Sequence, residues 1–170
     1  MSMLNIRNFI ILGVVSATSW ATAANEVQIS GNVASKCTIY TSTNGIYGNP
    51  TADVLSTATA DGGTPAVIRY DVVNAGTYKA VITTPVSFST SPSLNDTLAW
   101  TGSAAVSEVT DASMSAYDSS KRVFDNVTEF DLTIAGTVWF GAESKVEYGY
   151  GKSLPGGSYK AVVTAECIAL

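Results

Sequence analysis

Two cysteines, Cys37 and Cys167, are the residues of this 170-residue chain whose type and placement most clearly predict a chemistry. A redox dithiol usually has CxxC spacing, and a metal site needs ligands beyond two thiolates. These cysteines lie near opposite ends of the chain, which has no histidine. We therefore predict a structural disulfide, which would stabilise the fold by roughly 4–5 kcal/mol in the chain-entropy model.

Other catalytic patterns are missing. The absence of histidine excludes Ser-His-Asp and Cys-His sites and imidazole metal centres. Residues 151–153 (GKS) resemble the end of a phosphate-binding loop, but Val146 stands where that motif needs glycine. Asp125, Glu129 and Asp131 are the densest acidic group. They would serve an enzyme only if two carboxylates converged with one pKa raised. We predict no catalytic residue, no cofactor, no metal and no enzymatic activity.

Aromatic side chains offer a second kind of chemistry, stacking against a sugar ring. Trp100, Tyr148 and Tyr150 are the candidates for such binding, with residues 148–151 (YGYG) expected to form an exposed turn. Trp139 lies in the apolar run TVWF and is expected in the core. A secreted carbohydrate-binding module therefore stays open as an alternative.

The chain begins with the pattern of a secretory signal. Arg7 precedes an apolar run at residues 9–15, and residues 21–23 (ATA) resemble a signal-peptidase site. We expect residues 1–23 to be removed, leaving residues 24–170 as one exported domain in the periplasm, at the cell surface or outside a bacterium. No apolar run reaches the ~20 residues of a membrane span. Export favours the disulfide interpretation of the cysteine pair.

The charge balance is acidic. The chain has 9 basic and 14 acidic residues, so loss of Arg7 with the signal leaves 8 against 14 and a net charge of −6. An acidic surface repels phosphate backbones and anionic lipid. We predict neither nucleic-acid binding nor insertion into a membrane.

Alternation of apolar and polar residues predicts an all-β domain. Residues 66–73 and 77–83 flank Asn-Ala-Gly and indicate a hairpin. About ten short strands in one small domain favour a single antiparallel β-sandwich of immunoglobulin-like or pilin-like type. Cys37 and Cys167 share the parity of apolar residues on the first and last strands, so both sulfurs are expected to face inward. Further strands are expected at residues 27–33, 36–41, 53–58, 86–90, 97–101, 103–109, 130–134, 136–140, 144–148 and 158–169.

Three stretches break the alternation. Residues 43–50 and 61–65 contain glycine and proline and indicate loops, and residues 107–129 are polar without a clear period. The last stretch is expected to hold a short helix, or a strand and a mobile loop. Because loops on β scaffolds often carry function, it is a candidate surface.

The two ends of the chain resemble exported fimbrial subunits. In residues 156–170 (GGSYKAVVTAECIAL), Gly157 is followed by alternating Tyr159, Ala161 and Val163, as in the closing strand of chaperone–usher pilins and spore-coat-U-type domains. Residues 27–39 (VQISGNVASKCTI) are similar to a first pilin strand that leads into a cysteine. The resemblance implies a structural or adhesive subunit of a bacterial surface structure.

The resemblance also implies assembly residues and partners. Val27, Ile29 and Val33 mark a donated or edge strand, and residues 158–168 would contact a periplasmic chaperone. Copies of this chain or other surface subunits would join by strand addition. The chain departs from pilins in having Ala169 next to last, its second cysteine in the last strand, and little sequence between the expected cleavage site and Val27. A domain complete in itself, with a glycan as its ligand, is the alternative.

Overall fold

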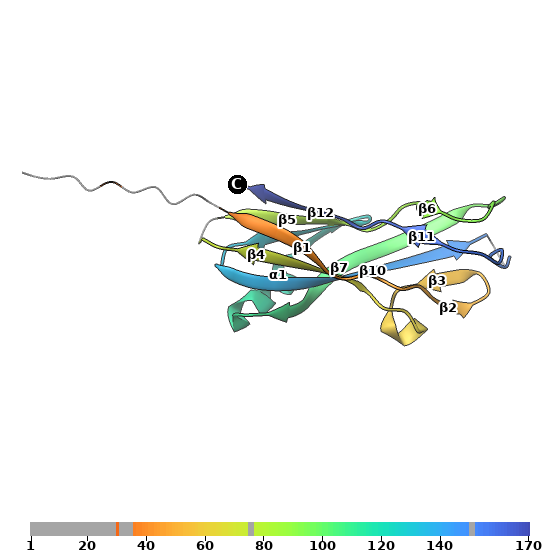
Figure 1. Cartoon of the computed structure of the whole chain (residues 1–170), viewed down its shortest axis with the longest axis horizontal. Helices are drawn as coiled ribbons and strands as arrows, with labels where there is room; N and C mark the ends of the chain where they lie inside the picture. The colour runs from red at the N-terminus through yellow and green to blue at the C-terminus, as the bar shows by residue number, and fades with distance from the viewer. Residues whose placement is uncertain (1–29, 31–35, 75–76, 150–151) are drawn as a thin grey trace, which may run out of the picture. The chain divides into compact units, whose positions relative to one another are not determined.

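The structure, a computed structural model, describes residues 30, 36–74, 77–149 and 152–170 (Figure 1). Its elements are β1 (Cys37–Thr43), β2 (Gly48–Thr51), β3 (Val54–Ser56), η1 (Thr59–Asp61), β4 (Ala66–Val72), β5 (Tyr78–Thr83), β6 (Phe88–Thr90), β7 (Leu98–Val109), η2 (Ala112–Ala116), α1 (Tyr117–Ser120), β8 (Arg122–Phe124), β9 (Val127–Leu132), β10 (Gly136–Tyr148), β11 (Lys160–Ala161) and β12 (Thr164–Ala169). No helix among these described residues is long and apolar enough to cross a membrane.

The strands form two main antiparallel sheets. One has six strands, in which β10 is central: it pairs with β4 and β3 along one edge and with β7 along the other, while β1 extends the sheet from β4 and β2 from β3. The second has the order β12-β5-β9-β8, and β11 and β6 form a small separate pair. The predicted all-β, antiparallel class is confirmed.

Inward-facing side chains of the two sheets make one core. Val138 and Phe140 alternate along β10, and Phe130 and Leu132 alternate along β9; all four are buried. The rings of Phe130 and Phe140 stack at 4.1 Å between centroids, so the two sheets are in direct contact. Two layers packed face to face are the predicted sandwich.

The disulfide also joins the two layers. Cys37 at the start of β1 and Cys167 in β12 are bonded, with their Cα atoms 6.4 Å apart. Both sulfurs pack against the core cluster, as their parity predicts. The first and last described strands are therefore held together at one end of the sandwich, the end marked C in Figure 1.

Several expected strand boundaries are wrong. Strands expected at 97–101 and 103–109 are one strand, β7, and those expected at 136–140 and 144–148 are one strand, β10. Gly102 suggested a break, yet it continues β7 where that strand passes close to the other sheet: a Cβ there would lie 2.3 Å from Thr84 Oγ1. The expected strand at 158–169 is divided into β11 and β12. The expected strand at 27–33, apart from Ser30, lies outside the described residues, as do positions 75 and 76 of the expected hairpin loop.

Residues 107–129 hold ordered structure of both expected kinds. They contain η2, the short helix α1 and strand β8. Tyr117, at the start of α1, is buried, and its hydroxyl oxygen accepts hydrogen bonds from the amides of Thr133 and Ile134. This contact anchors α1 against the turn that follows β9.

Candidate functional site

A groove of about 840 Å³ lies between the end of β1 with the loop that follows it and the segment that precedes β12. In the described part of the chain β1 pairs only with β4 and β12 only with β5, so each forms an edge of its sheet. One wall of this assembly groove comes from residues 41–47 and the other from residues 157–163. Its lining also includes Leu55, Thr57, Ala66, Val67, Ile68, Pro85, Ser89, Ala142 and Ser144.

The floor of the assembly groove is the sandwich core itself. Leu55, Ile68 and Ala142 line it, and all three belong to the buried hydrophobic residues of the six-stranded sheet. On the rim, Ile46 is 63 % exposed and Val162 is 60 % exposed. An apolar floor with apolar residues at its rim is typical of a surface that another chain covers.

The walls carry backbone groups without a strand partner. Lys36, just before β1, accepts a hydrogen bond from the Val73 amide, so by alternation the residues of β1 whose backbone N–H and C=O groups face β4 are Thr38 and Tyr40. The N–H groups of Cys37, Ile39 and Thr41 therefore point to the outer edge, and of these three residues Thr41 lines the groove. On the opposite wall, residues 162 and 163 lie between β11 and β12 and pair with no strand in the described ranges.

An aromatic cluster holds the far end of the assembly groove. Phe88 of β6 lies at its centre, with ring centroids at 4.7 Å from Trp100, 5.0 Å from Tyr159 and 6.4 Å from Tyr47. Tyr47 and Tyr159 also line the groove, one from each wall. The Tyr159 hydroxyl donates to the Pro155 carbonyl at 2.6 Å, and burial raises the pKa of Tyr159. The cluster thus fixes the separation of the two walls.

Gly157 allows the second wall to pass close to Pro92. Its φ of 156° is one that side chains rarely adopt, and an added Cβ would lie 2.5 Å from Pro92 Cγ. We expect Gly157→Ala to lower the free energy of unfolding by about 1–3 kcal/mol in urea denaturation. Gly156→Ala is the matched control, because a Cβ there meets nothing within 4 Å. An equal loss in both variants would contradict this assignment.

The aromatic residues proposed as sugar ligands do not form an exposed platform. Trp100 is half-buried against Phe88, and its Nε1 is buried without a hydrogen-bond partner in the described structure. Tyr148 is only 6 % exposed, so its expected exposure is wrong. The reason is that β10 extends to residue 148 and Tyr148 has the inward parity of Val146. Tyr150 lies outside the described residues.

Trp139 lies on the outer face and not in the core, so that expectation is also wrong. Its neighbours Val138 and Phe140 face inward, which turns the indole outward. The guanidinium of Arg69 lies 5.6 Å from the centroid of Trp139 and 5.5 Å from that of Tyr40. These three residues are aligned across β1, β4 and β10, a row that the sequence did not reveal. Arg69 occupies a face of each ring, which stabilises the sheet surface.

Two of the three acidic residues considered for catalysis, Glu129 and Asp131, are in ion pairs. Glu129 accepts hydrogen bonds from Lys79 and Arg122, with Lys79 the larger influence, and its pKa is lowered. Asp131 also pairs with Arg122, at 2.9 Å. A general acid needs the opposite shift. Within the described ranges no three His, Cys, Asp or Glu residues are grouped so as to hold a metal ion.

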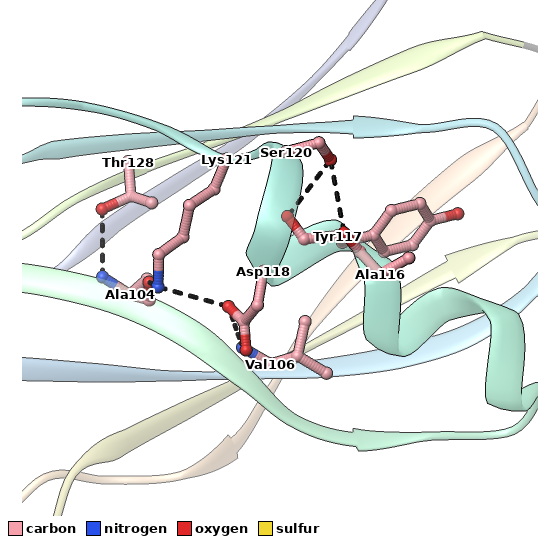
Figure 2. Close-up of polar contacts among 8 residues, drawn as sticks. All are labelled: Ala104, Val106, Ala116, Tyr117, Asp118, Ser120, Lys121 and Thr128. Atoms are coloured by element: carbon pink, nitrogen blue, oxygen red, sulfur yellow. Dashed lines mark hydrogen bonds and ion pairs between the residues drawn. The ribbon is translucent and has the colours of Figure 1, made fainter.

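At Ala104 and Val106 the outer edge of β7, in contrast to the assembly groove, is closed by side chains (Figure 2). The Ala104 amide donates to Thr128 Oγ1 at 3.0 Å, and the Ala104 carbonyl accepts from Lys121 Nζ at 3.1 Å. The Val106 amide donates to Asp118 Oδ1 at 3.1 Å, and Lys121 also pairs with Asp118. Side chains, a lysine among them, take the place of a neighbouring strand, which blocks pairing with another chain.

Loss of the Thr128 hydroxyl will leave the Ala104 amide unsatisfied, since Ala104 is buried. We expect Thr128→Val to lower the free energy of unfolding by about 1–3 kcal/mol in chemical denaturation. Thr133→Val, at an exposed position, is the control and should change it by less than about 0.5 kcal/mol. A neutral Thr128→Val would show that water satisfies this amide.

Comparison with known proteins gives no relative: no protein-family model, no curated protein and no solved structure matches the chain. The assembly groove and the closed β7 edge are therefore the features on which a function can be argued.

Proposed function

We propose that this chain is a non-enzymatic, exported subunit of a bacterial surface structure, and that copies join when a strand of one enters the assembly groove of the next. The observation that carries this proposal is a groove with buried hydrophobic residues on its floor, the outward-facing backbone of Thr41 on one wall and the unpaired residues 162 and 163 on the other. A strand added there would gain backbone hydrogen bonds from the edges and bury alternate side chains on the floor.

The donor segment we assign is residues 27–33 of another copy (VQISGNV). Val27, Ile29 and Val33 share one parity, as a strand with one face on an apolar floor requires. The segment has seven residues, and each wall of the groove spans seven positions, 41–47 and 157–163. Seven strand residues extend about 23 Å.

Charge supports the same occupant. Lys160 is the one charged residue among those lining the groove, and residues 27–33 carry no charge. An uncharged strand therefore enters without leaving an unpaired ion in the groove. A highly charged ligand would find no matching set of partners there.

The proposal implies that the groove is covered before assembly. The exposed apolar side chains at the rim, Ile46 and Val162, favour non-specific association, so a periplasmic chaperone that contacts residues 158–168 fits the same surface. Glycan binding stays a prediction of the sequence, with no exposed aromatic groove among the described residues to favour it.

Size-exclusion chromatography with light scattering on residues 24–170, with the disulfide formed, tests the proposal. We expect multimers, and we expect Ile29→Asp to be a monomer because it places a carboxylate on the apolar floor. A peptide of sequence VQISGNV should bind that monomer. A wild-type chain that stays monomeric and whose Ile29→Asp variant ignores the peptide would refute strand addition.

A further inference from the structure

The disulfide leaves no room for a strand beside it. Neighbouring strands in a sheet lie about 4.7–4.9 Å apart, so a strand inserted between two edges needs them about 9.5 Å apart. The Cα atoms of Cys37 and Cys167 are 6.4 Å apart. An added strand must therefore end before it reaches this level.

The assembly groove begins at equal distances along the chain from the two cysteines. Its first lining residues are Thr41, four residues beyond Cys37, and Val163, four residues before Cys167. Four strand residues extend about 13 Å. Residues 38–40 of β1 and 164–166 of β12, which lie between the disulfide and the groove, do not line the groove, whereas Thr41 and Val163 do.

We propose that the Cys37–Cys167 disulfide is the end stop of the assembly groove: it bounds the inserted strand at this end and fixes its register. This inference rests on the proposed function. An edge without a stop lets a strand slip by two residues and keep the same face buried. Here a slip toward the disulfide would drive the strand into the space that the bridge occupies.

The same stop prevents a copy from filling its own groove. Residues 34–36 are the link between the donor segment and β1, and a hairpin through them would set Val33 opposite Cys37 and Ile29 opposite Thr41. In such a hairpin, residues 30–33 would lie beside the disulfide, where the strand has no room. Only residues 27–29 would reach the groove. Donation therefore occurs between copies, which yields open chains of subunits.

Amide hydrogen exchange with the VQISGNV peptide tests the stop. The acceptor is the disulfide-bonded Ile29→Asp variant, whose own donor segment is disabled. The amides of Ile39 and Thr41 both point to the outer edge of β1, and only Thr41 lies beyond the stop. We expect saturating peptide to slow exchange at Thr41 by at least about tenfold and to leave Ile39 unchanged.

The outcomes separate the two proposals. Slowed exchange at both Ile39 and Thr41 would overturn the end stop and leave strand addition standing. No binding of the peptide would overturn strand addition itself. In Ile29→Asp with Cys37→Ala and Cys167→Ala, the Ile39 amide should gain protection together with Thr41. If that variant does not fold, the disulfide-bonded protein alone decides the question.

Discussion

Replacing Cys37 and Cys167 together with alanine will lower the free energy of unfolding by about 4–5 kcal/mol. The bridge closes a loop with a sequence separation of 130, and loss of so large a constraint lets the unfolded chain gain entropy. The folded state loses as well, because the bridge ties edge strands of opposite sheets. Urea denaturation of the Ile29→Asp protein, which the proposed function expects to be a monomer, with and without the two changes, gives the difference.

The denaturant slope separates these two contributions. If the bridge acts on the unfolded chain, its removal exposes more surface on unfolding, so the m-value rises while stability falls. Chemical reduction of the unmutated cysteines is the matched control and should give the same loss. If the free energy of unfolding falls by less than about 2 kcal/mol, the stability comes mainly from packing between the sheets, through pairs such as Phe130 and Phe140, and not from the disulfide.

The sequence predicted what depends on local periodicity. Alternation along residues 66–72 and 130–132 places inward and outward residues as the structure has them, and parity alone put both sulfurs with the core. Trp139 was misplaced because its apolar run suggested burial, whereas its parity within β10 turns it outward. In a sandwich, parity outweighs hydropathy, since a strand has only two faces.

The assembly groove could not be predicted from the sequence, because it arises from strands that are far apart in the chain. Ile46 and Val162 are ordinary β-forming residues locally, and only the position of β1 and β12 on the same side of the sandwich makes them the rim of one groove. The cluster around Phe88 is equally non-local: Tyr47, Trp100 and Tyr159 come from three separate regions. Tyr159 and Val163 were singled out through the resemblance to fimbrial subunits, and both line this groove.

Two variants that each disable one side of the joint are expected to be monomers alone and a 1:1 dimer when mixed. Ile29→Asp disables the donor segment and leaves the groove intact. Val163→Arg puts a long cationic side chain at the wall of the groove, where Val163 packs against the core, and leaves the donor segment intact. Each change should weaken self-association by at least about 100-fold, since a buried charge without a partner costs several kcal/mol.

The mixture is informative because it contains one intact donor segment and one intact groove, on different variants. The donor segment of Val163→Arg can enter the groove of Ile29→Asp, and neither free end of that dimer can continue the chain. Light scattering should therefore give twice the monomer mass and nothing larger. Val123→Arg is the matched control, at an exposed position of β8 on the edge of the second sheet away from β12, and it should assemble like the wild type. If Val163→Arg assembles by itself, the contact between copies lies on another surface. If the mixture stays monomeric, residues 27–33 and the groove are not the two surfaces that bind each other.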